Sequence, residues 1–85
     1  MGDFYCLMLW DQLDLATKKE LVHWLRLAID DMRDNFQSQI IRLAFKADSE
    51  NTRKLFSVYP KELAVVSAWK AERIRPDFTL AETEA

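Results

Sequence analysis

Cys6 and His23 are the only cysteine and the only histidine in the chain, and a thiol nucleophile and its base could be built from such residues. A Cys–His pair needs both side chains in one cleft, with a third group that orients the base. Nothing in the sequence places the two together. His23 lies between Lys19 and Arg26 on a polar helical stripe, so we interpret it as a surface residue. Cys6 has apolar neighbours, and we interpret it as a small core residue of a protein from a reducing compartment.

An acidic cluster is the second candidate for chemistry. Asp30 and Asp34 lie one helical turn apart, with Asp31 between them, and two carboxylates so placed could help to hold a hard cation. A calcium site needs six or more oxygens, usually from a loop with a glycine at its turn, and Gly2 is the only glycine. We therefore predict a solvated acidic face beside Arg33, with no metal and no cofactor, and we expect a protein that is not an enzyme.

Basic side chains concentrate in the middle of the chain. Residues 40–76 carry eight basic and four acidic side chains, whereas residues 1–39 carry four basic and seven acidic ones. The end of the chain from Asp77 carries three acidic side chains and no basic one, and the net charge is −2. A nucleic-acid-binding domain usually presents a stronger, uninterrupted basic face. The charge distribution therefore disfavours nucleic acid as the main partner.

A helix-turn-helix variant is nevertheless the second function that the pattern suggests. A short helix before Pro60 and a following helix over residues 60–73 have the order of such a motif. Glu62 and Glu72 would face phosphates, which weakens this interpretation. We keep nucleic-acid binding through segment 42–75 as the alternative hypothesis, and its candidate contacts are Arg53, Lys54, Lys61, Lys70 and Arg73.

The elements that must position these residues begin with residues 3–13. Phe4 to Trp10 are seven consecutive apolar residues, and one amphipathic face cannot hold seven in a row. The run is either a buried strand or a helix that is covered on most sides. We favour the helix, because an unpaired strand would leave its backbone groups without hydrogen bonds.

Residues 17–37 show the clearest helical pattern. Thr17 and Glu20 form a capping-box pair, which predicts the start of the helix. Polar residues then recur at spacings of four or three and define its solvent face; they are Lys19, His23, Arg26, Asp30, Arg33 and Gln37. Apolar residues fill an arc of roughly 160° on the opposite side, which is wider than one neighbouring helix can cover. Leu27 falls outside this arc, close to the polar stripe.

Residues 36–47 also follow helical spacing, with apolar residues on two faces. They either continue the preceding helix or follow a kink near residues 35–38. Residues 40–45 also fit a short strand, which periodicity alone does not exclude.

Two helices follow, separated by Pro60. Asp48 and Ser49 are typical first residues of a helix. Pro60 ends that helix, because the residue before a proline avoids the α region, and it is also a good first residue for the next one. This last helix is predicted to run to about Arg73, and Pro76 stops the helical pattern.

The expected fold is all-α, a small bundle of about four helices, one of them short, in a single domain over residues 1–76. With one glycine and two prolines among 85 residues, the composition favours helices joined by few turns. Residues 77–85 are acidic, and we predict a frayed, flexible tail there. The run from Phe4 to Trp10 is too short to cross a bilayer and has no basic start, so we expect a cytoplasmic protein that does not bind membranes.

Residues 46–70 read KADSENTRKLFSVYPKELAVVSAWK, with helix caps, a helix–Pro–helix turn and a Trp69–Lys70 pair. This stretch resembles short uncharacterised helical proteins of phage and mobile elements. It covers under a third of the chain. The resemblance implies no activity.

The aromatic surplus is the most informative feature for function. Three Trp, five Phe and two Tyr exceed what a small core readily buries. The wide apolar arc of the helix over residues 17–37 also needs more than one neighbouring helix to bury it. Trp and Tyr are enriched at interface hot spots, and small oligomers are most often twofold dimers. We therefore expect a non-catalytic interaction module whose partner is a second copy or another protein. Its candidate contacts are Phe4, Met8, Trp10, Leu27, Tyr59 and Trp69.

Overall fold

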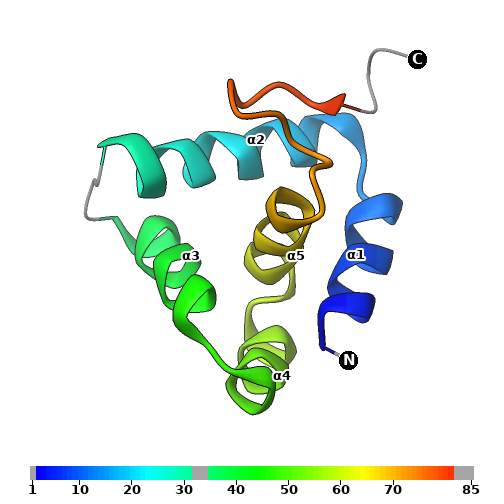
Figure 1. Ribbon diagram of the computed structural model, residues 1–85, viewed down its shortest axis with the longest axis vertical. Coiled ribbons are helices and arrows are strands. Elements are labelled where there is room, and N and C mark those ends of the chain that lie inside the picture. Colours follow the sequence, from blue (N-terminus) through cyan, green and yellow to red (C-terminus); the bar gives the residue numbers. More distant parts are fainter. Residues whose placement is uncertain (1, 32–34, 82–85) are drawn as a thin grey trace.

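The computed structural model describes residues 2–31 and 35–81, with side chains from Tyr5 onward. The all-α prediction is confirmed (Figure 1). The described residues form five α-helices and one π-helical turn, η1; they are α1 (Gly2–Gln12), α2 (Leu15–Arg26), η1 (Leu27–Asp31), α3 (Phe36–Lys46), α4 (Ser49–Val58) and α5 (Pro60–Lys70). There is one helix more than the expected four, because α3 is separate from α2.

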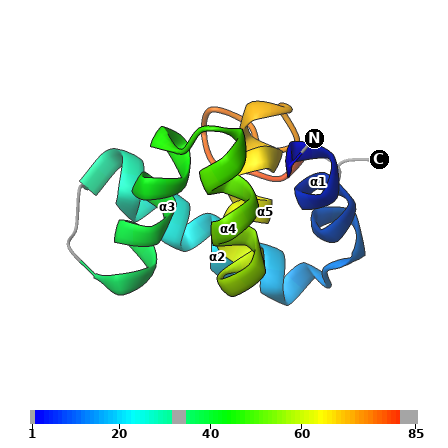
Figure 2. The ribbon, with the colours of Figure 1, turned by 90° about the horizontal axis from the view of Figure 1, so that it is seen from below.

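The last helix, α5, is the centre of the molecule. It packs against α1, α2, α3 and α4, which surround it in two perpendicular views (Figures 1 and 2). Six consecutive residues, 63–68, are buried, so this helix is apolar or small on every side.

Side-chain caps fix where α3 and α4 begin. The Asn35 side chain accepts a hydrogen bond from the Ser38 backbone N–H at 2.8 Å, and the Asp48 carboxylate accepts one from the Asn51 N–H at 2.8 Å. Both satisfy donors that a helix start leaves without an intrahelical partner. The predicted start at Asp48 is confirmed, and residues 40–45 belong to a helix rather than a strand.

The start of α2 differs from the prediction. The helix begins at Leu15 with Asp14 in the N-cap position, so Thr17 is its third residue rather than its cap. A hydrogen bond from the Thr17 side chain lowers the pKa of Asp14. The pair at this helix start is therefore Asp14 and Thr17, and the capping box predicted for Thr17 and Glu20 is wrong.

The end of α5 also differs, because the helix stops at Lys70 and not near Arg73. Glu72 takes a left-handed φ of 61°, the Arg73 N–H donates to the Ala68 carbonyl at 2.9 Å, and the Glu72 N–H donates to the Trp69 carbonyl at 3.2 Å. These two hydrogen bonds are the Schellman motif, which usually has glycine at the left-handed position. Because this position holds Glu72, the sequence has no glycine to indicate where the helix ends.

The segment after α5 folds back onto the helices. Ile74 and Leu80 form an antiparallel β-bridge, and both side chains are buried. The Asp77 carboxylate accepts hydrogen bonds from the Thr79 N–H at 3.1 Å and the Thr79 hydroxyl at 2.6 Å. The prediction of a frayed tail is wrong for residues 77–81, and residues 82–85 lie outside the described residues.

This segment also explains the wide apolar arc of α2. Leu80 lies over α2, where Val22 is buried, while α3 and α5 cover other sides of the α2–η1 rod. The arc is therefore covered largely from within the chain, and it does not by itself require a partner.

Candidate interaction surfaces

Cys6 and His23 do not form a catalytic pair. The Cys6 side chain is fully buried in the core, whereas His23 is exposed on α2, with its ring 5.1 Å from the ring of Trp24. Asp30 lies 4.0 Å from the Arg26 guanidinium in an exposed pair, and Asp34 falls outside the described residues. Within residues 2–31 and 35–81, no group of three or more His, Cys, Asp or Glu side chains is placed to hold a metal ion.

The helix predicted to read DNA is buried over residues 63–68. Residues 63–68 of α5 are buried by the four surrounding helices, whereas a recognition helix must expose one face to the major groove. This burial argues against the helix-turn-helix geometry predicted for residues 60–73, and nucleic-acid binding itself stays a prediction. The burial of α5 follows from its composition, because its Ala, Val and Leu side chains form part of the core.

The five candidate phosphate contacts are spread over the molecule. Lys61 and Lys70 lie at opposite ends of α5, about 14 Å apart along its axis. The Lys70 ammonium lies 5.9 Å from the centre of the Phe45 ring. Arg53 and Lys54 lie on α4, and Lys54 is 3.6 Å from the carboxylate of Glu50.

Arg73, the fifth of these residues, donates to the Asp11 carboxylate on α1. Its charge is therefore already compensated within the chain. Together with the spread of the other four, this pairing means that the five candidate residues do not form one concentrated basic face of the kind that typical phosphate-backbone binding uses.

Two of the predicted partner contacts are core residues. Trp10 is 0% exposed, and the Lys18 ammonium lies 5.4 Å from the centre of its ring. Leu27 is 9% exposed, because it begins the π-helical turn against which α3 packs. The predicted placement of Trp10 and Leu27 on an accessible surface is therefore wrong.

The other predicted contacts lie nearer the surface. Met8 is 44% exposed on α1, and the Phe4 side chain is outside the described ones. Tyr59 is half-buried, with its ring edge-on to that of Phe36 at 5.6 Å. Trp69 is half-buried and stacks on Phe78 at 5.1 Å, so the segment after α5 already covers one of its faces.

The structure adds five exposed apolar side chains that the sequence patterns did not single out. They are Tyr5, Leu15, Phe36, Leu43 and Val58, each 48–64% exposed. Single exposed apolar residues are ordinary on soluble proteins, so only neighbouring ones carry an argument. The helical spacing of Phe36 and Leu43, seven residues apart on α3, was a signal in the sequence that could have found this pair.

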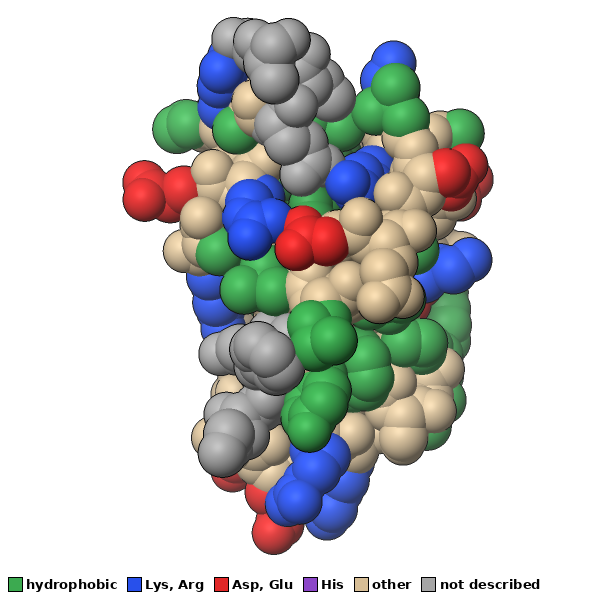
Figure 3. Space-filling view, turned by 90° about the vertical axis from the view of Figure 1, so that its right-hand side faces the viewer, with side chains coloured by type: hydrophobic (Ala, Val, Ile, Leu, Met, Phe, Trp, Pro, Cys, Tyr) green, Lys and Arg blue, Asp and Glu red, His purple; other side chains and the backbone are tan. Residues whose placement is uncertain are grey.

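The exposed face of α1 is the first such grouping. Tyr5 and Met8 lie one turn apart and are 60% and 44% exposed, while Cys6 and Trp10 on the other side of the helix are fully buried. Figure 3 shows hydrophobic side chains gathered on this side of the molecule, with charged side chains above and below them. We call Tyr5 and Met8 the α1 face.

A pocket of about 390 Å³ lies where α3 meets α4. Its apolar lining comes from Leu43, Ala47 and Leu55. Its polar lining comes from Lys46, Asn51 and Lys54. Both lysines are exposed. We call this site the α3–α4 pocket.

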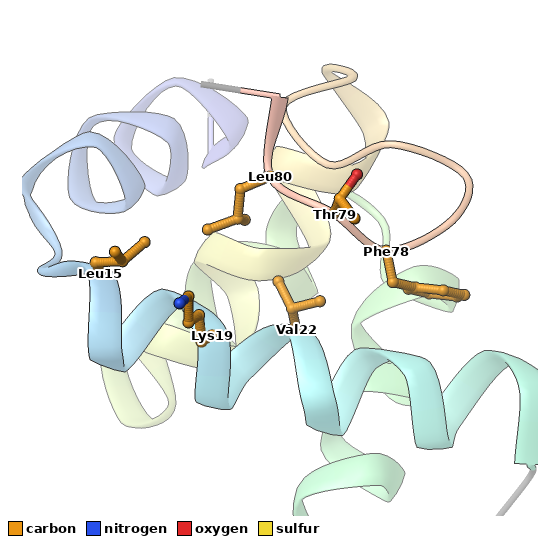
Figure 4. Close-up of a pocket in the computed structure, with 6 residues that line it drawn as sticks. All are labelled: Leu15, Lys19, Val22, Phe78, Thr79 and Leu80. Atoms are coloured by element: carbon orange, nitrogen blue, oxygen red, sulfur yellow. The ribbon is translucent and has the colours of Figure 1, made fainter. Parts of the chain in front are cut away.

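A second pocket, of about 340 Å³, lies between α2 and the segment after α5 (Figure 4). Leu15, Lys19 and Val22 line it from α2, and Phe78, Thr79 and Leu80 from the opposite side. In Figure 4 the Phe78 ring lies at one edge rather than over the centre. The lining holds one cationic side chain and no acid or nucleophile beyond the Thr79 hydroxyl, which already donates to Asp77.

Comparisons of the chain with protein-family models, with curated proteins and with solved structures find no match. Within the described ranges, no helix has the combined length and apolar character that crossing a lipid bilayer requires. The physical chemistry of the exposed faces is therefore the basis for assigning a function.

Proposed function

We propose that this protein is a helical interaction module that associates with a second copy of itself through the α1 face. The observation that carries the proposal is that α1 is apolar on two sides. Cys6 and Trp10 are buried against the rest of the molecule, while Tyr5 and Met8 face outward at 60% and 44% exposure. The outer side of a helix that only covers a core is polar along its length, whereas that of α1 carries Tyr5 and Met8 before the exposed polar residues Asp11 and Gln12.

A second copy is the partner that suits the charges around this face. Asp11, one turn beyond Met8, is paired with Arg73 of the same chain, so the described part of the face carries little unbalanced charge. A twofold contact brings identical surfaces together, and an unbalanced charge would repel itself across the axis. The neutral α1 face avoids that penalty, and burying both apolar side chains twice supplies the driving force.

We further propose that the protein is not an enzyme, needs no cofactor and works in the cytoplasm. The burial of Cys6 and the exposure of His23 on a polar stripe support the first point, because this thiol and this imidazole do not meet. A lone, buried thiol supports the last point, because it suits a reducing compartment.

The test is the solution mass across a range of protein concentrations, measured by sedimentation equilibrium. We expect a dimer for the native chain and a monomer for the double variant Tyr5→Asp/Met8→Asp. Trp10 is unsuitable as a test position, because a charge there would disrupt the core. Leu15→Asp, at a residue with similar exposure on α2, is the matched control and should remain dimeric.

Two results would contradict self-association through α1. The first is a native chain that stays monomeric at about 1 mM, which would mean that any dimer is too weak to matter. The second is a dimer that survives Tyr5→Asp/Met8→Asp, which would place the interface elsewhere. Circular dichroism on each variant separates a lost interface from a lost fold.

A further inference from the structure

We propose that the α3–α4 pocket is a docking site for an acidic amphipathic helix of another protein. The site differs from the α1 face in both location and charge, so this inference stands independently of self-association. Its apolar lining is Leu43, Ala47 and Leu55, and its volume of about 390 Å³ can take one large apolar side chain with space around it.

Charge complementarity identifies the chemistry of the partner. Lys46 and Lys54 are two of the lining residues, and the described lining contains no acidic residue. Lys54 lies 3.6 Å from Glu50, but both side chains are about 70% exposed, so this ion pair is weak and can be exchanged. A second copy presenting the same two lysines would be repelled, whereas carboxylates on a partner would be attracted.

The shape of the apolar surface favours a helix over a small amphiphile. Leu43 and Phe36 are 50% and 56% exposed and lie on the same side of α3, seven residues apart. Two helical turns separate them by about 10.5 Å along the axis. An amphipathic helix repeats its apolar side chains at this interval, so one side chain would enter the pocket while another would reach Phe36.

Tyr59 supports the far end of this surface. Its ring meets that of Phe36 edge-on at 5.6 Å, which fixes the exposed Phe36 ring against the α4–α5 junction. An aromatic side chain already held in place loses little conformational freedom when a partner docks, and this favours binding. Tyr59 was predicted to contact a partner; in this proposal it supports Phe36, which makes the contact.

The experiment uses a synthetic helical peptide with leucines at i, i+4, i+7 and i+11 and glutamates on both flanks of that stripe. A second peptide carries lysines in place of the glutamates. Binding to the full chain is measured by isothermal titration calorimetry at low and high salt. We expect the acidic peptide to bind with a micromolar Kd that weakens at high salt, and the basic peptide to bind at least tenfold more weakly.

Variants localise the binding. Leu43→Ser should weaken binding of the acidic peptide by about tenfold. Leu15 is a similarly exposed leucine on α2, and Leu15→Ser should leave the Kd unchanged. Lys46→Glu/Lys54→Glu should reverse the preference in favour of the basic peptide, and Lys19→Glu/Lys61→Glu is the charge-matched control. All four positions are exposed, so these changes leave the core intact.

Three results would overturn the proposal. They are no binding of the acidic peptide at about 1 mM, equal binding of the two peptides, or the same loss for Leu43→Ser and Leu15→Ser. Dodecanoate binding at the pocket without peptide binding would likewise overturn it, because the site would then serve a small amphiphile. The solution mass of Leu43→Ser should equal that of the native chain, which keeps this test separate from self-association.

Discussion

Arg73, which follows the last helix, donates a charged hydrogen bond to Asp11 in the first helix, across 62 residues of sequence. The Schellman turn at Glu72 places Arg73 at the end of α5, beside α1. The two side chains are 40% and 50% exposed, so water and salt reach both. The pair therefore orients the segment after α5 more than it stabilises the fold.

Removing this ion pair should have a small effect. In a double-mutant cycle with Asp11→Asn and Arg73→Gln, we expect a coupling energy of no more than about 1 kcal/mol at low salt, and less in 1 M salt. Urea denaturation of the four proteins measures it. A coupling above about 2 kcal/mol that persists in high salt would mean that solvent does not screen the pair.

The Ser38 hydroxyl should be dispensable for stability. Ser38 is 0% exposed, and its Oγ has no hydrogen-bond partner among the described residues. Because a buried polar group without a partner carries its full desolvation penalty, Ser38→Ala should raise the free energy of unfolding by about 1 kcal/mol. Ser57→Ala, at an exposed serine that bonds the Lys54 carbonyl, is the control and should be nearly neutral. A clear loss of stability in Ser38→Ala would reveal a partner for the hydroxyl.

Replacing Glu72 with glycine at the end of α5 should stabilise the protein. Glu72 holds a left-handed φ of 61°, which costs a residue with a Cβ about 1–2 kcal/mol. Glu72→Gly relieves that cost but frees the unfolded chain, so we expect a net gain of about 0.5–1 kcal/mol in thermal or urea unfolding. Glu72→Ala removes the same charge and keeps the Cβ. Equal behaviour of the two variants would assign the effect to charge instead.

Acid should loosen the segment after α5. Hydrogen bonds from the side chain and the backbone N–H of Thr79 lower the pKa of Asp77 below 3.8 in the folded state. Because the folded pKa is the lower one, this stabilisation is present above the unfolded pKa and is lost as pH falls through the folded value. We therefore expect stability to fall below about pH 4, and to fall less steeply in Asp77→Asn.

Urea midpoints measured between about pH 2 and 6 check this slope. Thr79→Val keeps the carboxylate and removes the hydroxyl donor, so it should flatten the curve in the same direction. Identical slopes for the native chain and Asp77→Asn would show that this carboxylate does not contribute to the acid sensitivity.

The sequence predicted those parts of the fold whose signals are local. The scarcity of glycine indicated helices, and Asp48 and Pro60 marked a helix start and a helix junction that the structure confirms. Each signal acts within three or four residues, through a cap or a fixed φ. Such effects do not depend on what the rest of the chain does.

The errors came from features that depend on tertiary contacts. Leu27 looks exposed on an ideal helical wheel, but a π-helical turn and α3 bury it. The acidic end of the chain looked like a tail, but its Leu80 pairs with Ile74, joins the core and lies over α2, which only the folded arrangement brings about.

The same limit applies to the candidate surfaces. Apolar residues in excess of the core were predicted, but which of them stay exposed depends on how the helices pack. Trp10 was predicted at the surface and is buried, whereas Tyr5, in the same apolar run, is 60% exposed. The α3–α4 pocket joins residues from two helices and their linker, and no single periodic pattern contains it.

The position of α5 has a consequence for the synthesis of the protein. Residues 60–70 are translated after the four helices that pack around them, so those helices are synthesised before the helix on which they pack. Until then Trp10, Leu25 and Ile41 have no completed core to enter. These apolar side chains therefore have no complete core until α5 has been made and released, and during that interval aggregation and chaperone binding compete with folding.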